Sequence, residues 1–427
     1  MLIGSVADDI TGATDLCLML SRAGMHTVQV IGLPEPGQAL PQADAVVIAL
    51  KSRTISATQA VEMSVASAKA LLNAGAEQLL FKYCSTFDST DTGNIGPVIE
   101  ALMTLTGADL AIACPSFPAN GRTVYKGHLF VGSQLLSDSP MKDHPLTPMR
   151  DSDLLRVLGR QVKGSVGLVD SSVISKGALA VREAFAAARG TGQSILVVDT
   201  LNDADLLTLG EACEGMRLVT GGSGIALGLA ANFARAGRIE PGHAPSTMPA
   251  PKGRSVSLAG SCSVATRGQI DAAQLAGMPT RALDAEALAA GRETATSLAE
   301  WAISTADADL PPLIYSSTDP ATLARTQALL GRATSGALVE HALADIAVAL
   351  QTAGFTRFVI AGGETSGAVV EALGIRMLEI GPEIDPGVPW TRSVGVPDLA
   401  LALKSGNFGA PDFFLRAWSL LTLEAAG

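Results

Sequence analysis

The sequence predicts an α/β protein with two domains, each a mostly parallel sheet flanked by helices. The chain has 427 residues, which is more than one ordinary hydrophobic core accommodates. Strand-like and helix-like segments alternate along most of it, and this alternation is typical of parallel sheets. Apolar residues make up 48% of the chain and aromatic residues only 4%. The abundant Gly and Ala suit tight packing of helices on strands.

The N-terminal half shows the alternation first. Short apolar runs predict strands, and apolar residues at helical spacing predict helices. The expected strands are 2–7, 27–32, 45–50, 78–81, 110–114, 166–169, 194–199 and 217–220, and the expected helices are 13–22, 57–73, 95–105 and 178–188.

The stretch 237–254 (GRIEPGHAPSTMPAPKGR) contains four prolines and little apolar periodicity, as expected of a surface linker. It predicts domains at 1–236 and 255–427. The second domain shows the same alternation of strand-like and helix-like segments as the first. Its expected strands are 255–259, 312–315, 357–361, 377–380 and 399–403, and its expected helices are 265–277, 285–305, 320–330 and 339–354.

The bulk properties exclude several classes of partner. The formal net charge is −11 and there is no basic run, so neither nucleic acid nor an anionic membrane is an expected partner. The start, MLIGSVADD, reaches acid at Asp8, unlike a signal peptide. No apolar run reaches the roughly 18–20 residues of a membrane span. The cysteines are scattered, odd in number and without a CxxC pair, as in a reducing compartment. A soluble, cytoplasmic protein is expected.

Two adjacent acids, Asp8 and Asp9, end the first predicted strand and precede Thr11-Gly12 and a helix. Ligands of open α/β sheets gather at such strand ends. A carboxylate there could take a proton from an attacking hydroxyl group or help to hold a metal ion. The alternative is that one of the acids only caps the helix.

Further polar residues follow later strands. Arg53 stands after the strand 45–50, and the run FKYCSTFDST places Lys82 and several acceptors after the strand 78–81. Such a mixture suits a polyhydroxy carboxylate, because donors bind the acid group and acceptors bind the hydroxyl groups. The alternative is a loop whose residues cap and turn the chain. The candidate acceptors in this run are Ser85, Thr86 and Asp88.

A long irregular stretch at 114–150 contains Arg122, His128 and His144. Long loops in compact domains are often functional, although metal ligation by either histidine is not the favoured interpretation. Residues 1–150 hold nine Lys and Arg, of which seven lie in these polar segments. An acidic chain with this distribution is arranged for an anionic ligand.

Three glycine-rich turns follow strands in the second domain: AGSCS at 259–263, AGGETSG at 361–367 and KSGNFG at 404–409. Backbone N–H groups at such turns form sites for phosphate. The sequence has no GxxxxGK[ST] motif, which excludes a P-loop enzyme. Gly222-Ser223-Gly224 lacks the third glycine of a dinucleotide fingerprint, and is interpreted as an ordinary βα turn.

These motifs together resemble the four-carbon acid sugar kinase family over nearly the whole chain. The motifs that show the resemblance are ADDITGATD, KYCSTFDST with GNIGP, NGRTVYKGHLFVG, MKDHPLTPM, GSCS, GGETSG and KSGNFG. The resemblance implies an acid-sugar-binding N-terminal domain, a nucleotide-binding C-terminal domain and an active site in the cleft between them. LKSRT, FKYCSTFDST and KDHPLTPM most resemble the branch that phosphorylates 3-oxo-tetronates on the terminal (4-) hydroxyl group.

The resemblance also implies ATP and Mg²⁺ as cofactors, and ATP contacts at Ser261, at Gly363, Glu364, Thr365 and Ser366, and at Gly406. We expect Asp8 or Asp9 to act on the acceptor hydroxyl group. Arg53 and Lys82 are expected on the substrate carboxylate, with Ser85, Thr86, Asp88 and Arg122 also in the substrate site.

Several alternatives stay open at this point. The expected partners are a small-molecule sugar acid and ATP, and self-association into a homo-oligomer is left open. Threonate or erythronate kinases of the same family are the nearest alternative. An AMP-forming ligase that activates the acid, or a sensor that binds it without turnover, would belong to a different class. The residues alone do not separate a kinase from such a ligase.

Overall fold

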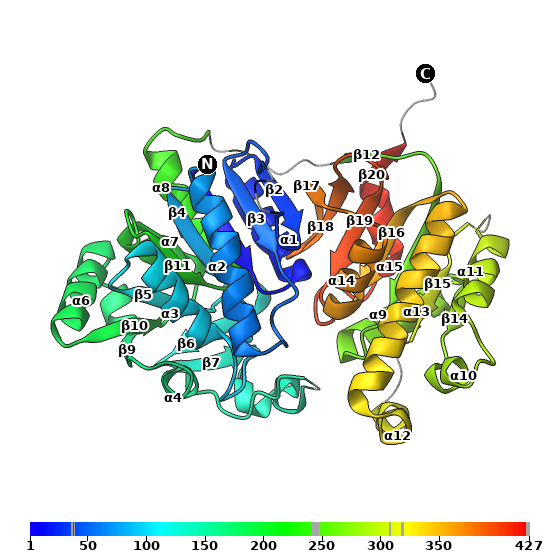
Figure 1. Cartoon of the computed structure of the whole chain (residues 1–427), viewed down its shortest axis with the longest axis horizontal. Helices are drawn as coiled ribbons and strands as arrows, with labels where there is room; N and C mark the ends of the chain where they lie inside the picture. The colour runs from blue at the N-terminus through cyan, green and yellow to red at the C-terminus, as the bar shows by residue number, and fades with distance from the viewer. Residues whose placement is uncertain are drawn as a thin grey trace. The chain divides into compact units, whose positions relative to one another are not determined.

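A computed structural model describes residues 1–423, except 36, 38, 145, 241, 243–246, 307–308 and 317–319. It consists of two compact units, Met1–Ala244 and Pro245–Gly427. Figure 1 colours the first unit from blue to green and the second from green to red. The boundary between them falls inside the proline-rich stretch 237–254. Within that stretch, Met248–Ala250 form strand β12, which pairs in parallel with β20 (Leu421–Leu423) of the second unit.

The first unit is built on a parallel sheet with the strand order β2-β3-β1-β4-β11-β5-β10-β9. Short apolar runs form these strands, as predicted. Their bounds are β1 Ile3–Ala7, β2 Thr27–Ile31, β3 Ala45–Ala49, β4 Gln78–Lys82, β5 Ala111–Cys114, β9 Ser165–Val169, β10 Gln193–Val198 and β11 Leu218–Gly221. The helices are α1 Ile10–Arg22, α2 Ala57–Asn73, α3 Ile95–Thr106, α4 Leu154–Gly159, α5 Ser171–Ile174, α6 Ala178–Gly190, α7 Asp203–Ala212 and α8 Ala226–Arg235.

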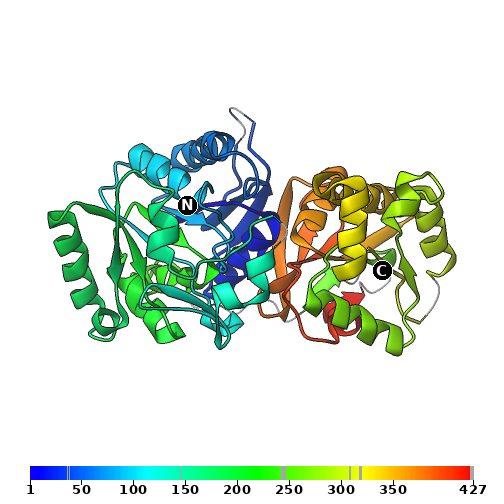
Figure 2. The same cartoon turned by 90° about the horizontal axis from the view of Figure 1, so that it is seen from below.

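Helices cover both faces of this sheet (Figures 1 and 2). The chain passes from β1 to β2 in one direction along the sheet and from β3 to β4 in the other. Because βαβ connections are right-handed, α1 and α2 lie on opposite faces. Contacts agree with this arrangement, since α1 packs on α8 whereas α2 packs on α3. The two directions of travel place a topological switch point beside β1, where ligands of open sheets gather.

The stretch 114–150 is more regular than the sequence predicts. It forms a small antiparallel sheet of β6 (Arg122–Tyr125), β7 (His128–Val131) and β8 (Gln134–Leu135). Three short 3-10 turns, at Pro118–Asn120, Leu136–Asp138 and Pro140–Asp143, complete it. The strands are only two to four residues long, too short to show an alternating pattern.

The second unit has the strand order β14-β15-β13-β16-β19-β18-β17. The first five strands are parallel, and β17 and β18 are antiparallel additions. The bounds are β13 Arg254–Ala259, β14 Thr280–Ala282, β15 Leu313–Tyr315, β16 Phe355–Ala361, β17 Met377–Asp385, β18 Val388–Ser393 and β19 Ala400–Lys404. Its core includes Trp390, which is fully buried and donates to the carbonyl of Ala417. The predicted fold class, two α/β units with mostly parallel sheets, is confirmed.

Two expectations for the second unit were wrong in detail. The single helix expected at 285–305 is two helices, α10 (Ala285–Ala289) and α11 (Ala295–Ser304). Gly291, with a φ of 68°, turns the chain between them, and Thr294 caps the second helix. The sequence pattern also predicted only the start of β17, at 377–380, and did not predict its antiparallel partner β18. The remaining helices are α9 Val264–Leu275, α12 Pro320–Leu330, α13 Arg332–Thr352, α14 Gly363–Ala372 and α15 Phe413–Arg416.

Among the described helices, no single one is both long and apolar enough to cross a membrane. Ala324–Leu330 and Thr334–Thr352 reach that length and composition only when taken together, and the chain bends by 101° between them.

Candidate active site

The carboxyl ends of β1, β3, β4 and β11 lie side by side in the first unit. Ala7 pairs with Ala49 on one side and with Lys82 on the other, and Lys82 pairs with Gly221. The residues that follow these strands therefore meet at one edge of the sheet. Strand ends that are 33 to 214 positions apart in the chain are brought together by this register alone.

Asp8 is held rigidly at this edge. Its N–H donates to the carbonyl of Lys82 (3.0 Å), and its own carbonyl accepts from the N–H groups of Ser52 and Arg53 (2.9 and 3.2 Å). The guanidinium of Arg53 forms a fork on the carboxylate, with Nε to Oδ2 at 3.0 Å and Nη2 to Oδ1 at 2.8 Å. Bidentate pairs of this kind fix orientation as well as charge.

Asp9 caps helix α1. Its Oδ1 accepts from the N–H of Gly12 (3.1 Å) and its Oδ2 from the hydroxyl of Thr11 (2.8 Å). The capping interpretation considered above is therefore correct for Asp9, but it does not exclude catalysis. Arg53 Nη2 also reaches Asp9 Oδ1 at 2.6 Å. The Asp9 side chain keeps 16% of its surface exposed, against 5% for Asp8.

The two carboxyl groups differ in acidity. Burial raises the pKa of Asp8, and the attraction of Arg53 offsets only part of that rise. Burial also acts upward on the pKa of Asp9, but there Arg53, Lys82 and the hydrogen bonds from Thr11 and Gly12 outweigh it and lower the pKa. Asp9 is thus the more acidic and the more accessible of the two groups.

Asp88 brings a third carboxylate to Arg53. Its Oδ2 lies 3.7 Å from Arg53 Nη1, and its Oδ1 accepts from the Thr86 hydroxyl at 2.7 Å. Phe87 and Asp88 have φ values of 63° and 31°, which non-glycine residues seldom adopt. Backbone strain of this kind concentrates at functional sites.

Lys82 and Arg122 are the other cations of this edge. Lys82 is buried, donates to the carbonyl of Tyr83 (2.9 Å) and adds to the positive field on Asp9. Burial lowers the pKa of the Arg122 guanidinium, whereas Cys84, Asp88 and Asp15 act in the opposite direction. Arg122 therefore lies within electrostatic reach of the Asp88 cluster.

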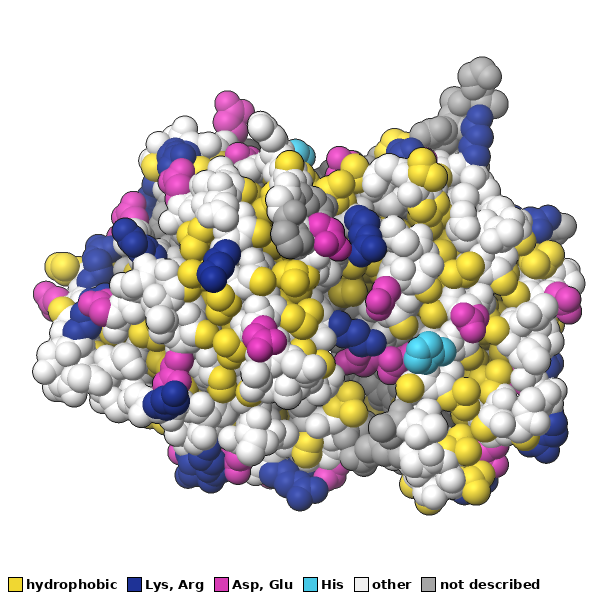
Figure 3. All heavy atoms as spheres, viewed as in Figure 1, with side chains coloured by type: hydrophobic (Ala, Val, Ile, Leu, Met, Phe, Trp, Pro, Cys, Tyr) yellow, Lys and Arg dark blue, Asp and Glu magenta, His cyan; other side chains and the backbone are white. Residues whose placement is uncertain are grey.

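The positive charge is less concentrated than the sequence predicts. Of the seven cations in the polar segments, three belong to this edge, namely Arg53, Lys82 and Arg122. The other four are exposed: Lys51, Lys126, Lys142 and Arg150. Lys126, for example, pairs with Asp170 at 2.7 Å. On the face drawn in Figure 3, the described Lys and Arg side chains are interspersed with Asp and Glu rather than gathered.

Two supports of this edge were missed. Asn94 donates its amide to the carbonyls of Ser52 and Arg53 (2.6 and 3.2 Å) and so holds the loop that carries Arg53. Ser223 donates to Asp15 Oδ2 at 2.5 Å. Both residues could have been found from the sequence. Asn94 stands at the start of the helix predicted from the GNIGP motif, and Ser223 stands in the Gly-Ser-Gly turn after β11. That turn was interpreted as a connection only.

Gly12 is required by the packing of the two charged side chains beside it. A Cβ at this position would overlap Asp9 Oδ1 and lie 2.8 Å from Lys82 Nζ. We expect Gly12→Ala to lower kcat at least about tenfold, because the cap and the ammonium group must both shift. Replacing a helical glycine contributes roughly 0.5–1 kcal/mol, which offsets part of the about 0.5–2 kcal/mol lost when the cap is displaced. Only a small change in thermal stability is therefore expected.

Gly190→Ala is the matched control for that substitution. It also lies in a helix of the first unit, and a Cβ there would meet nothing within 4 Å. Steady-state rates and thermal unfolding of both variants check the prediction. Equal activity of Gly12→Ala and Gly190→Ala would contradict it.

The three glycine-rich turns of the second unit also share one edge. They follow the neighbouring parallel strands β13, β16 and β19, with Ala259 paired to Ala361 and Ala361 paired to Lys404. The turns contact each other closely. A Cβ on Gly260 would overlap the Thr365 hydroxyl, and a Cβ on Gly406 would overlap the Ser261 hydroxyl.

The four predicted ATP contacts Gly363, Glu364, Thr365 and Ser366 form the first turn of α14. The preceding residue, Gly362, has a φ of 126° and makes no side-chain cap. Its N–H instead donates to the carbonyl of Lys404 at 2.8 Å, which ties the second turn to the third. The start of a helix carries partial positive charge and suits an anion.

Among the residues that the structure describes, no three His, Cys, Asp or Glu side chains are grouped as a metal site. His128 Nδ1 contacts the carbonyl of Lys126, and His144 Nδ1 accepts from the N–H of Thr147. The five cysteines are all free.

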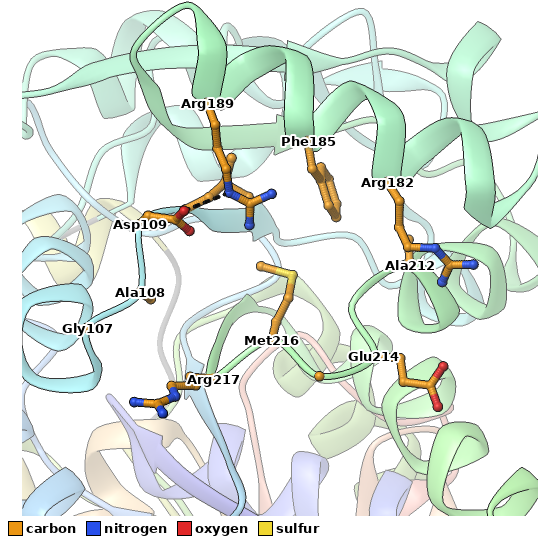
Figure 4. Close-up of a pocket in the computed structure, with 12 residues that line it drawn as sticks. Gly107, Ala108, Asp109, Arg182, Phe185, Arg189, Ala212, Glu214, Met216 and Arg217 are labelled. Atoms are coloured by element: carbon orange, nitrogen blue, oxygen red, sulfur yellow. Dashed lines mark ion pairs between the residues drawn. The ribbon is translucent and has the colours of Figure 1, made fainter.

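A pocket of about 470 Å³ lies at the opposite edge of the first unit's sheet (Figure 4). Arg182, Arg189 and Arg217 line it, and Arg189 pairs with Asp109 at 3.0 Å. A second pocket, of about 580 Å³, is lined by residues 89–92 and by parts of 148–160. Neither pocket contains a predicted site residue, although the second begins next to Asp88.

Comparisons with known proteins agree with the two units. Residues 3–229 match the family model described as a sugar-binding N-terminal domain, and residues 256–414 match the one described as a nucleotide-binding C-terminal domain. The chain is 52% identical to a 3-oxo-tetronate kinase of Cupriavidus necator, over 97% of this chain and 96% of that protein. A protein of the same name from Methylobacterium radiotolerans is 48% identical, over 99% of both chains.

Two solved structures share the fold over almost their full length. A protein of Salmonella typhimurium LT2, provisionally described as a tRNA synthase, has a TM-score of 0.84 and 41% identity, covering 98% of this chain and 99% of that one. A Haemophilus influenzae protein has a TM-score of 0.76 and 40% identity, covering 98% and 100%.

Proposed function

Because this chain belongs to the four-carbon acid sugar kinase family, we propose that it transfers the γ-phosphoryl group of ATP to the 4-hydroxyl group of a 3-oxo-tetronate. The observation that carries this proposal is the identity of about half the residues, over nearly the whole of both chains, with proteins named 3-oxo-tetronate kinase. Membership of the family makes the chain a kinase, and the choice of hydroxyl group is the finer part of the proposal.

The acceptor hydroxyl group would lie against Asp9. Its oxygen attacks the γ-phosphorus, the bond between that phosphorus and the β-phosphate oxygen breaks, and ADP leaves with the electron pair. Asp9 accepts the hydroxyl proton. The greater exposure of the Asp9 side chain supports this assignment over Asp8. The lowered pKa of Asp9 keeps its carboxylate ionised but makes it the weaker base of the two. Asp8, with both oxygens on Arg53, would hold the guanidinium in place.

The substrate carboxylate needs a positive partner. Arg53 already faces Asp8, Asp9 and Asp88, so much of its positive charge is neutralised by the chain's own carboxylates. We therefore assign the larger share of substrate binding to Lys82, beside the start of α1, and to Arg122. Ser85, Thr86 and Asp88, all buried at the same edge, would bind the substrate's oxygen atoms.

ATP would bind to the three turns of the second unit, at Ser261, at residues 363–366 and at Gly406. The uncapped start of α14 supports this part of the proposal. Mg²⁺ is typically held in kinases by phosphate oxygens, water and one or two carboxylates. Because the described residues contain no preformed group of three such ligands, phosphate oxygens and water would supply most of the ligands. When bound, the ion would neutralise charge on the transferred phosphoryl group.

A nucleotide-product assay across four-carbon sugar acids tests the proposal. We expect ADP release with 3-oxo-tetronates and turnover at least about tenfold lower with tetronates that lack the 3-oxo group, since a polar site rejects analogues without its partner group. Phosphorus NMR of the product should show a phosphate ester on carbon 4.

Two outcomes would contradict it. Preference for threonate or erythronate would move the chain to another branch of the family. Release of AMP and pyrophosphate would indicate an acid-activating ligase.

A further inference from the structure

Lys404 is the last residue of β19, at the start of the third glycine-rich turn, and it is fully buried. Long cationic side chains are rarely buried without a specific set of partners. A lysine at the end of a strand would ordinarily extend into solvent. Its burial under a turn assigned to the nucleotide therefore needs a reason.

The Lys404 ammonium group lies inside the turn. Nζ donates to the hydroxyl of Thr266 (3.0 Å) and to the carbonyls of Ser405 (3.1 Å) and Gly406 (3.2 Å). Three acceptors match the three N–H bonds of an ammonium group. The ring of Phe413 lies 5.9 Å away on another side.

These contacts set the direction of two peptide planes. In a trans peptide the C=O and the following N–H point in opposite directions. Because the carbonyls of Ser405 and Gly406 both point at the buried ammonium group, the N–H groups of Gly406 and Asn407 point away from it. Successive N–H groups on one side of a turn form a concave site for an anion.

The first glycine-rich turn packs against the third turn. The hydroxyl of Ser261 lies so close to Gly406 that a Cβ on the glycine would overlap it. Thr266, which shares the Lys404 ammonium, donates to the same Gly406 carbonyl at 2.8 Å, as does Ser263 at 2.5 Å. The donors of two turns are thus fixed relative to each other.

Folding does not require the lysine for these carbonyls. The Ser405 carbonyl also accepts from the N–H of Phe408 (3.2 Å), and the Gly406 carbonyl keeps Ser263 and Thr266. Removing Lys404 would leave both carbonyls paired and would remove a buried charge, a change that is often neutral or stabilising.

From this geometry we infer that Lys404 is a positioning residue for the nucleotide: its ammonium group orients the peptide planes of Ser405 and Gly406 so that their partner N–H groups receive a phosphate. It does not touch ATP itself. The inference rests on the proposed assignment of ATP to this unit. It adds to the nucleotide site a residue that would not contact the phosphates directly.

The first test compares Lys404→Met with wild type. We expect the KM for ATP to rise at least about tenfold, the size of a weakened hydrogen bond to a charged phosphate group, because the N–H groups of Gly406 and Asn407 are no longer held in place. The KM for the sugar acid should be unchanged. ADP affinity, measured by calorimetry, should fall by a similar factor. Lys252→Met, an exposed lysine of the same unit, should match wild type in both measurements.

The fold of the variant can be checked in the same unit, because all three tryptophans, Trp301, Trp390 and Trp418, belong to it. Their fluorescence during thermal unfolding should show no loss of stability. If Lys404→Met does not fold, Thr266→Val replaces it. That variant removes the shared hydroxyl group, and its KM for ATP should rise about fivefold, the size of one net hydrogen bond.

A second measurement separates positioning from a purely structural role. Burial lowers the pKa of Lys404 to about 7, whereas Asp385 of β17 acts in the opposite direction. Asp385 itself accepts from Arg416 of α15 and from the N–H of Ala410. A bound phosphate would raise the pKa of Lys404, so ADP binding at pH 7.5 should take up a fraction of a proton. Calorimetry in buffers of different ionisation enthalpy measures that uptake, and Lys404→Met should abolish it.

The outcomes discriminate clearly. The inference would be overturned if a folded Lys404→Met protein kept wild-type ADP affinity and wild-type proton uptake. If only Thr266→Val folds, an unchanged KM for ATP in that variant would overturn it. Either result would leave the kinase assignment intact. A wild-type protein that neither binds ADP nor releases it would instead refute the proposed function, and the inference with it.

Discussion

Asp9→Asn should reduce kcat by about 10²–10⁴-fold, the usual contribution of a general base, while the KM for ATP stays within about threefold of wild type. Asn has the same shape as Asp, and its side-chain oxygen can still accept from the N–H of Gly12, so helix α1 keeps its cap. What is lost is the carboxylate that would accept the proton of the substrate hydroxyl group. Steady-state kinetics with ATP and 3-oxo-tetronate varied separately provide the measurement.

Asp153→Asn is the matched control. Asp153 also caps a helix of the first unit, accepting from the N–H groups of Leu155 and Arg156, and it lies outside the candidate site. We expect kcat of this variant to match wild type. Asp8→Asn should also lose turnover, because it loosens Arg53. Full activity in both Asp8→Asn and Asp9→Asn would refute the assignment of the pair.

Arg53→Met should lower the free energy of unfolding of the first unit by about 3–5 kcal/mol, the cost of leaving buried charge unpaired. The guanidinium faces three carboxylates whose side chains are 5%, 16% and 7% exposed, those of Asp8, Asp9 and Asp88. Met retains the apolar bulk of the side chain but none of the donors. Turnover should be lost as well, since the orientation of Asp8 and Asp9 depends on the same group.

The measurement must follow the first unit rather than the second. Tryptophan fluorescence reports the second unit only, so far-UV circular dichroism or calorimetry in urea is needed alongside it. Arg160→Met is the control, because Arg160 pairs with Asp91 on the surface, where both side chains are largely exposed. Such a pair contributes about 0–1 kcal/mol. Equal stability of the two variants would contradict a structural role for the Arg53 cluster.

The effect of Arg53→Met should depend on pH. The folded-state pKa of Asp9 is lowered, with Arg53 as the largest lowering cause, so Asp9 contributes stability above its unfolded pKa of about 3.9. That contribution disappears as the pH falls through the folded-state pKa. Removing Arg53 takes away the largest lowering cause for both Asp8 and Asp9, so the folded-state pKa values of both groups rise in the variant. The stability difference between wild type and Arg53→Met should therefore be largest near neutral pH and shrink as the pH falls through those raised values.

The fold was largely predictable because its strands are short, continuous apolar runs separated by clear turns. Such runs are typical of strands that are buried on both faces. The errors have physical causes. The strands β6, β7 and β8 are too short and too exposed to show a period, and Gly291 divides a run of good helix formers. The antiparallel pairing of β17 and β18 depends on neighbours that local composition does not specify.

The family was also predictable, because its motifs stand at strand ends with recognisable residues, and the comparisons confirm it. The roles of individual residues stay predictions, as does the placement of the active site between the domains. Arg53 illustrates the limit. Its position after a strand and its charge are visible in the sequence, but its engagement with Asp8, Asp9 and Asp88 is not.

By itself, therefore, the sequence determined the α/β class, the family and the segments that carry the chemistry, because these depend on local pattern and residue type. Only the tertiary structure decided which charges meet. Pairing β1 with β3 and β4 brings Arg53 onto Asp8 and Asp9 across more than 40 positions of chain. Pairing β16 with β19 buries Lys404 beneath the turn it orients. Burial and partner choice are consequences of strand order, and they set the acidity and the accessibility on which the proposed mechanism depends.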